Sequence, residues 1–139
     1  MELVLPGIES LASARIETET PMTDEEFWCF CSSLPDNLRG ERDPNGDIII
    51  MPPAGGESSN RNLHIIIELG LWARRDGRGR GFDSNTNFIL PNGAARSPDV
   101  GWILNSRLAT LTAQQKRRFL PLCPDFVVEL KSPSDRLPS

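Results

Sequence analysis

The stretch DFVVELK at residues 125–131 is a short apolar run that ends on two charged residues. Its composition predicts a β-strand. Because side chains alternate between the two faces of a strand, Glu129 and Lys131 should project on one face, and Val128 and Leu130 on the other. An acid and an ammonium on the same face of an otherwise apolar strand indicate either a functional pair or an exposed ion pair at a strand end.

A second acid, Asp99, stands near the start of another apolar run, SPDVGWIL at residues 97–104, and precedes Glu129 by 30 positions. One or two carboxylates are enough to hold Mg²⁺ when water and phosphate oxygens fill its other positions. A lysine beside such an ion can orient or deprotonate an attacking water and stabilise charge on the phosphate. We therefore predict Asp99, Glu129 and Lys131 as catalytic residues of phosphodiester cleavage, with Asp99 and Glu129 as ligands of Mg²⁺ or Mn²⁺.

Lysine is rare in this chain. Lys131 and Lys116 are its only lysines among 15 basic residues. Where charge alone is needed, the chain uses arginine, which supports a specific role for Lys131.

Length and composition predict one loop-rich globular domain over residues 1–139, because the chain holds 11 glycines and 12 prolines. No apolar run approaches the length of a membrane-spanning helix, and residues 1–6 lack the features of a secretion signal. We therefore expect a cytoplasmic protein with no membrane partner.

The formal net charge of −4 argues against broad affinity for nucleic acid, which depends on many phosphate contacts. Any basic surface must be local, and the segment RRDGRGRG at residues 74–81 is the candidate, with Arg74, Arg75, Arg78 and Arg80. These arginines could clamp a phosphate backbone. The interpretation that we favour is a helix that ends at Gly77 and is followed by a solvated loop, so the nucleic-acid contact is a weak prediction.

In the first half of the chain, residues 1–20 show no period and predict a loose arm. The capping box TDEE at residues 23–26 predicts a helix that runs to about Leu34. The turn PNG at residues 44–46 then joins two strands of a hairpin, 38–42 and 47–51. From Ser58 or Ser59 a longer helix should follow, with one apolar stripe formed by Leu63, Ile66, Ile67, Gly70 and Leu71.

In the second half we expect a meander of three strands at residues 82–84, 87–90 and 97–104, the last two joined across the turn PNG at 91–93. A helical stretch should cover residues 106–119 and carries a second capping box at 112–115. The chain should end in a loop after residue 131.

Four motifs in this sequence resemble the Uma family of putative restriction endonucleases, which belongs to the PD-(D/E)XK nuclease superfamily. They are IMPPAGGES at residues 50–58, GFDS at 81–84, RSPDV at 96–100 and PDFVVELKSPS at 124–134. The similarity covers nearly everything from Thr23 onward.

This resemblance implies a restriction endonuclease-like α/β fold, in which helices flank a mixed sheet and an N-terminal helix and β-hairpin precede it. It implies a metal site at Asp99, Glu129 and Lys131, and a Mg²⁺-dependent hydrolase that cleaves DNA. It also implies that Glu57, just ahead of the long helix, supplies an additional catalytic acid, with Glu68 as the alternative.

One departure from the family is that its members usually continue after the motif SPS with a helix and a closing strand, whereas this sequence stops at Ser139. The core sheet would then have an open edge with unpaired backbone groups. Two expectations follow. We expect a homodimer in which a second copy covers that edge. The alternative is a truncated, non-catalytic interaction or nucleic-acid-binding module that keeps the nuclease fold.

Overall fold

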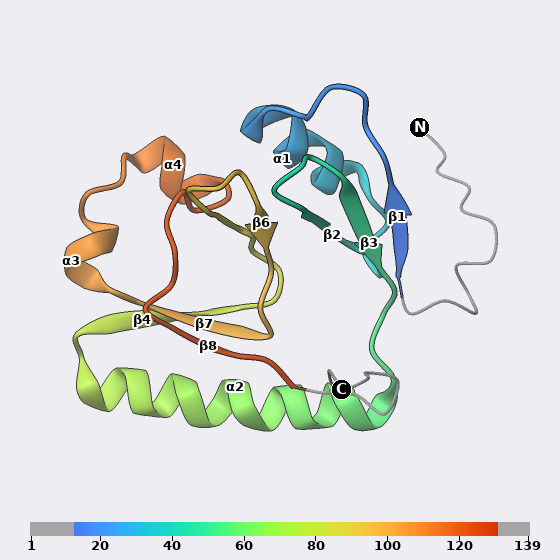
Figure 1. Cartoon of the computed structure of the whole chain (residues 1–139). Coiled ribbons are helices and arrows are strands. Elements are labelled where there is room, and N and C mark those ends of the chain that lie inside the picture. Colours follow the sequence, from blue (N-terminus) through green and yellow to red (C-terminus); the bar gives the residue numbers. More distant parts are fainter. Residues whose placement is uncertain (1–12, 131–139) are drawn as a thin grey trace, which may run out of the picture. The chain divides into compact units, whose positions relative to one another are not determined.

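The structure is a computed structural model that describes residues 13–130. The chain folds into two compact units (Figure 1). Within the described part, unit 1 comprises residues 13–53, 85–97 and 112–123, and unit 2 comprises residues 54–84, 98–111 and 124–130. Three separate chain segments contribute to each unit, so neither is a contiguous stretch. That residues 1–139 form a single domain stays a prediction.

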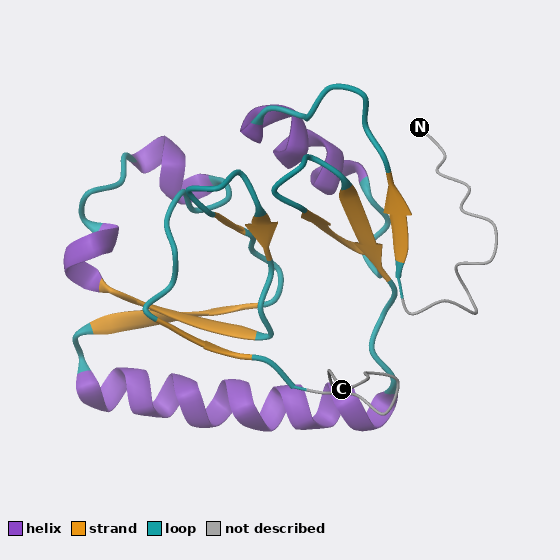
Figure 2. Cartoon of the chain, in the orientation of Figure 1, coloured by secondary structure: helices purple, strands orange, loops and turns teal. Residues whose placement is uncertain are grey.

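Unit 1 is a five-stranded antiparallel sheet with the strand order β1-β3-β2-β6-β5, accompanied by two helices (Figure 2). Its core contains Phe27, Ile48, Ile50 and Ala95, none of which is exposed to solvent. The elements are β1 (Ala14–Ile16), α1 (Asp24–Ser33), β2 (Arg39–Arg42), β3 (Ile48–Met51), β5 (Phe88–Ile89), β6 (Ala95–Arg96) and α4 (Ala113–Arg117).

Two local predictions in unit 1 are confirmed. Helix α1 begins at the predicted capping box, in which the Thr23 hydroxyl accepts from the Glu26 N–H and the Glu26 carboxylate accepts from the Thr23 N–H. The predicted hairpin is β2 paired with β3, and its turn contains Gly46 at a φ of 95°, a conformation that favours glycine.

Unit 2 holds all the predicted site residues that the structure describes. Its antiparallel sheet has the order β4-β7-β8, and the long helix α2 packs along one face of it (Figure 1). The ring centroids of Trp72 on α2 and Trp102 on β7 are 5.2 Å apart in an edge-on arrangement. The elements are α2 (Gly56–Asp76), β4 (Gly79–Asp83), β7 (Val100–Leu104), α3 (Asn105–Leu108) and β8 (Phe126–Val128).

Helix α2 does not bury the stripe that its sequence predicts. Leu63, Ile67 and Leu71 are 54%, 46% and 47% exposed, whereas Ala73 is buried and Ile66 is half-buried. The helix also begins earlier than expected, at Gly56. Apolar residues are spread widely around α2, so periodicity alone did not identify the side that meets the sheet.

The predicted meander is wrong. The turn at residues 91–93 joins β5 to β6 in the sheet of unit 1, while β7 pairs with β4 and β8 in the sheet of unit 2. The arginine-rich segment also differs from the predicted loop. Gly77, with a φ of 75°, ends α2 as expected, but β4 already starts at Gly79 because residues 79–83 pair with β7.

Three further expectations can be compared with the described residues. The predicted helical stretch at 106–119 is two short helices, α3 and α4, and the capping box at Thr112 is present at the start of α4. The predicted arm contains β1, which pairs with β3, and residues 1–12 lie outside the described part. Within residues 13–130, no helix has both the length and the apolar character that crossing a bilayer requires.

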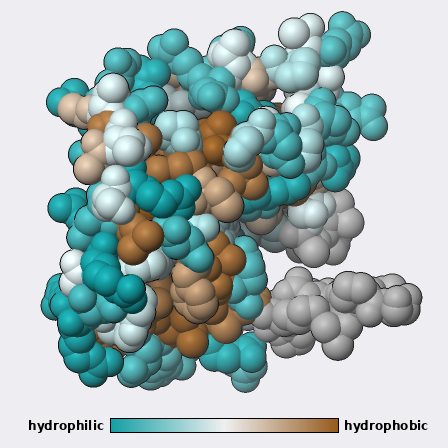
Figure 3. Space-filling model, turned by 60° about the vertical axis from the view of Figure 1, so that its left-hand side comes forward, coloured by the Kyte–Doolittle hydropathy of each residue, from teal (hydrophilic) through white to brown (hydrophobic). Residues whose placement is uncertain are grey.

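Exposed large apolar side chains concentrate in unit 2. Figure 3 shows hydrophobic residues reaching the surface on the face that it presents. All the large hydrophobic residues that are markedly exposed in the described part belong to α2 or β8: Leu63, Ile67, Leu71, Trp72, Phe126 and Val127. The apolar strand predicted at residues 125–131 is β8, which lies at the edge of its sheet and is largely exposed.

Packing around β4 yields a first prediction. A Cβ atom at Gly79 would lie 2.5 Å from ring atoms of Trp102, whereas a Cβ atom at Gly81 would meet only the Gly101 oxygen at 3.8 Å. We expect Gly79→Ala to lower the free energy of unfolding by about 1–3 kcal/mol through overpacking. Gly81→Ala should change it by less than about 0.5 kcal/mol. Urea unfolding of both variants measures this difference, and equal stability of the two would contradict the close packing of Gly79 against Trp102.

Candidate metal centre

The two predicted metal ligands lie at the same end of one pair of strands. Strands β7 and β8 are antiparallel, with Val100 opposite Val128. Asp99 directly precedes β7 and Glu129 directly follows β8, so one further step of the same register sets them opposite each other. Directly opposite residues of an antiparallel pair have Cβ atoms about 4.5–5.5 Å apart. The two apolar strands that carry the predicted acids are thus neighbours in one sheet.

The Asp99 carboxylate is held by the backbone of the partner strand. Its Oδ2 accepts a hydrogen bond from the Leu130 N–H at 2.6 Å, and the residue is half-buried. Asp99 follows Pro98, which has no N–H to donate. A carboxylate has about four acceptor sites, so this bond fixes its orientation and leaves Oδ1 able to bind a further ligand. Glu129 is exposed.

A second aspartate acts in the same way at the other end of the pair. Asp125 follows Pro124 and precedes β8, and its Oδ2 accepts from the Leu104 N–H at 2.9 Å and lies 3.0 Å from the Arg107 guanidinium. The Leu104 N–H, and more weakly Arg107, hold the pKa of the Asp125 carboxyl below its usual value, against the opposing effect of burial.

Buried side chains anchor β7 on both of its faces. Val100 and Trp102 face α2, since Val100 lines a pocket with residues of that helix and Trp102 packs on Trp72. Ile103 is fully buried and Val100 is 3% exposed. Because β7 is anchored by these residues, Asp99 at its start has a defined position.

Of the other predicted site residues, the structure describes Glu57 and Glu68 but not Lys131. Lys131 lies outside the described residues. Glu57 is exposed in the first turn of α2, and Glu68 is exposed farther along the same helix. Within residues 13–130, no three His, Cys, Asp or Glu side chains gather closely enough to hold a metal ion. The described carboxylates therefore offer Asp99 and Glu129 as a pair, without Glu57 as a third ligand, and the role of Glu57 stays a prediction.

The four predicted arginines come from three different elements of unit 2. Arg74 and Arg75 lie in the last turn of α2, and Arg80 lies on β4. Arg78, in the turn between them, is paired with Asp76 at 2.9 Å. All four are exposed, so the weak prediction of a nucleic-acid contact remains open to test.

A comparison with family models identifies the family to which the chain belongs. The fold is α/β, and an acid at the start of one strand faces an acid at the end of its neighbour. A family model described as "Putative restriction endonuclease", Uma2, matches residues 24–138, and the chain belongs to this family. Its membership confirms the resemblance seen in the sequence. No curated protein matches the chain.

Sequence reasoning missed Asp125, although a signal for it was present. The dipeptide Pro-Asp stands directly before an apolar strand twice, at 98–99 and 124–125, whereas its third copy, at 35–36, does not. Both aspartates accept a backbone N–H from the partner strand. The repetition of the dipeptide could have predicted this shared structural role.

The hydrogen bond of Asp99 yields a second prediction. We expect Asp99→Ala to speed amide hydrogen exchange of Leu130 by about tenfold or more, because a bond from an N–H to a charged acceptor is lost. Asp99→Asn keeps an acceptor oxygen and should have a smaller effect. The Leu104 amide, bound by Asp125, is the internal control, and unchanged exchange at Leu130 in Asp99→Ala would show that the carboxylate does not hold it.

Proposed function

We propose that this protein is a Mg²⁺-dependent endonuclease that cleaves phosphodiester bonds of DNA, and that Mn²⁺ can replace Mg²⁺. Membership in the Uma2 family supports the nuclease assignment. The observation that carries the proposal is the placement of Asp99 and Glu129 at the same end of the β7–β8 pair.

The side chains present fit a hard divalent cation. Both candidate ligands are carboxylates, and Mg²⁺ typically binds one or two carboxylates while water and substrate phosphates complete its shell. Asp99 has its Oδ2 oriented by the Leu130 N–H and keeps Oδ1 for the ion, while Glu129 is exposed and accessible. A pair without a third acid is therefore sufficient for this kind of site.

The residues of the chain would share the work as follows. Asp99 and Glu129 hold and position the cation, and the Leu130 N–H limits rotation of the Asp99 carboxylate. When bound, the ion neutralises charge on the phosphoryl oxygens and lowers the pKa of water. Lys131, which lies outside the described residues, would orient the attacking water and take its proton. Glu57 would act as an additional acid from the start of α2.

Nicking of supercoiled plasmid DNA tests this proposal and is our third prediction. The protein should nick DNA with Mg²⁺ or Mn²⁺ and not with excess EDTA. Asp99→Asn, Glu129→Gln and Lys131→Met should each lower the rate by about 100-fold or more, because each removes a ligand or the catalytic ammonium. Asp36→Asn, which removes an exposed carboxylate in unit 1, is the matched control and should keep the rate.

Comparison of Glu57→Gln with Glu68→Gln decides which acid of α2 contributes. Only Glu57→Gln should reduce nicking. Circular dichroism of each variant separates loss of activity from loss of folding. If the folded protein nicks no DNA with either metal, or if the three site variants are as active as Asp36→Asn, the nuclease proposal fails. DNA binding without cleavage would then support the alternative, a non-catalytic nucleic-acid-binding module.

We also propose a homodimer that forms through the exposed side of α2. Leu63, Ile67 and Leu71 follow one another at intervals of four residues and so form one apolar stripe on the outer side of this helix. Antiparallel pairing of two copies centred on Ile67 would bury both stripes. It would also bring the acidic first turn of each α2, with Glu57, near the basic last turn of the other, with Arg75. The cytoplasmic location stays a prediction.

Sedimentation velocity tests the dimer and is our fourth prediction. The protein should sediment as a dimer, and Ile67→Glu should raise the dissociation constant by about 30-fold or more, because it places a charge at the centre of the interface. Arg61→Glu, at an exposed position of α2 about 120° around the helix from Ile67, should leave it unchanged. A monomer at all concentrations, or a dimer that Ile67→Glu does not weaken, would rule out this interface.

A further inference from the structure

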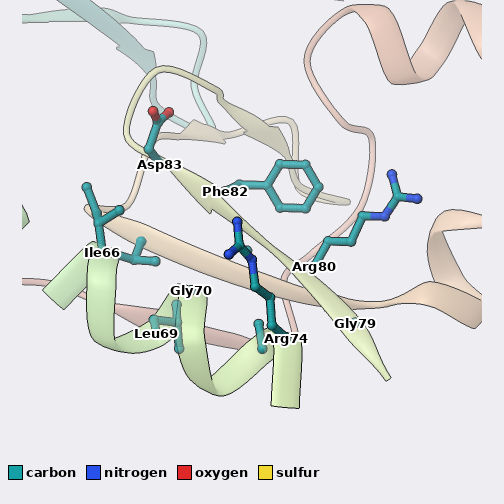
Figure 4. Close-up of a pocket in the computed structure, with 11 residues that line it drawn as sticks. Ile66, Leu69, Gly70, Arg74, Gly79, Arg80, Phe82 and Asp83 are labelled. Atoms are coloured by element: carbon teal, nitrogen blue, oxygen red, sulfur yellow. The ribbon is translucent and has the colours of Figure 1, made fainter. Parts of the chain in front are cut away.

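A pocket of about 480 Å³ lies between helix α2 and the edge strand β4 of unit 2. Its apolar part is formed by Ile66, Leu69 and Ala73 of the helix and by Val100 of β7. Figure 4 shows it from the side, with α2 below and β4 above. Its volume falls within the range of about 300–1,000 Å³ that is typical of sites for small ligands.

Glycines form part of both walls of this pocket. Gly70 lies on the helix, and Gly81 lies on β4, where alternation of side chains turns it toward α2 together with Gly79. A Cβ atom at Gly70 would meet nothing within 4 Å, and one at Gly81 would be in ordinary van der Waals contact. Packing therefore requires glycine at neither position.

Backbone conformation does not require these two glycines either. Within residues 13–130, positive φ values occur only at Gly46, Gly77 and Gly93. Glycine weakens helix and strand interiors because it has more conformational freedom to lose. Gly70 and Gly81 thus destabilise the helix and the strand that contain them. Because they have no side chains, they leave open space on the two facing walls of the pocket. Gly79 differs, since Trp102 occupies the space where its Cβ would be.

The two ends of the pocket differ in charge. Arg74 stands at the end near Gly79 and extends from α2 toward β4 (Figure 4). Among residues 13–130, the Arg74 guanidinium forms no hydrogen bond or ion pair. Asp83 and Val100 line the opposite end, and Val100 is the residue directly after Asp99. The pocket therefore carries an available guanidinium at one end, and its other end lies near the start of β7.

We propose that this pocket binds one nucleotide, with the base between Gly70 and Gly81 and the phosphate on Arg74. A flat base suits an apolar slot whose walls lack side chains, and a guanidinium can hold phosphate with two hydrogen bonds. The proposal rests on the proposed action on DNA. It adds a site for an unstacked base on the face of the sheet that α2 covers, and such extrusion is a known means of reading a base.

Titration with nucleotides, followed by ¹H–¹⁵N NMR of the full chain in EDTA, tests this and is our fifth prediction. The probes are the four 5′-deoxynucleoside monophosphates, a short DNA single strand, the matching duplex, and inorganic phosphate. We expect the monophosphates or the single strand to shift the amides of Gly70, Gly79 and Gly81. No shift with either probe, or equal shifts with inorganic phosphate alone, would overturn the proposal.

The decisive variants fill the pocket and leave the fold intact. Gly70→Leu and Gly81→Val place side chains in the open space and favour helix and strand. Each should weaken nucleotide binding by about tenfold or more while the unfolding temperature is not lowered. Ser59→Leu adds the same side chain to an exposed part of α2 outside the pocket and should have no effect. Unweakened binding in both filled variants would show that the nucleotide lies elsewhere.

Substitution of Arg74 tests the proposed phosphate contact, and substitution of the adjacent Arg75 is its control. Arg74→Gln should weaken binding by about tenfold, because a hydrogen-bonded ion pair with phosphate is lost. Arg75→Gln removes an adjacent exposed arginine that does not line the pocket and should have little effect. Equal effects of the two variants would indicate general electrostatic attraction and overturn the assigned phosphate contact.

Two comparisons separate this proposal from the proposed nuclease activity and identify the source of the nucleotide. Binding is measured without metal, so Asp99→Asn should retain it even though nicking is lost. A protein that binds nucleotides in the pocket but never nicks DNA would keep this inference and refute the nuclease. Tighter binding of the single strand than of the monophosphates identifies a base within DNA, and the reverse identifies a free nucleotide.

Discussion

The antiparallel pairing of β7 with β8 is the constraint on which the candidate site depends. Three residue pairs make up this ladder, which is short for a strand at a sheet edge. It is extended at both ends by aspartates that accept backbone N–H groups, Asp99 from Leu130 and Asp125 from Leu104. A bond from an N–H to a carboxylate is stronger than one to a neutral oxygen. The two aspartates therefore secure a strand whose apolar side chains, Phe126 and Val127, contribute little burial.

Asp99 thus stabilises the pairing of β7 with β8, and in the proposed function it also binds the metal ion. Asp125 shows that a Pro-Asp dipeptide before a strand can be structural alone, because its carboxylate is occupied by a backbone N–H and by Arg107. What distinguishes Asp99 is its neighbour, since Glu129 stands across the pair and no arginine or lysine within residues 13–130 forms an ion pair with the Asp99 carboxylate. The same hydrogen bond that secures the strand also fixes the direction of a candidate metal ligand.

Local signals in the sequence predicted α1, its capping box, the β2–β3 hairpin and the ending of α2 at Gly77, because each depends on residues close together in the chain. The adjacency of Asp99 and Glu129 was also predictable, from two apolar runs that each carry an acid. The buried side of α2, the start of β4 at Gly79 and the partner of each short strand were not. They are decided by contacts between distant segments. The pocket escaped prediction for the same reason, since Gly70 and Gly81 gain meaning only when their elements face each other.

The interleaving of the two units along the chain has a practical consequence. The backbone passes from one unit to the other five times, at residues 53–54, 84–85, 97–98, 111–112 and 123–124. No single deletion, and no choice of new N- and C-termini, gives a fragment that contains all the strands of one unit and none of the other. Expression of fragments and grafting of domains are therefore unsuitable for this protein. The carboxylates can be studied only in the intact polypeptide, and a circularly permuted gene would meet the same obstacle.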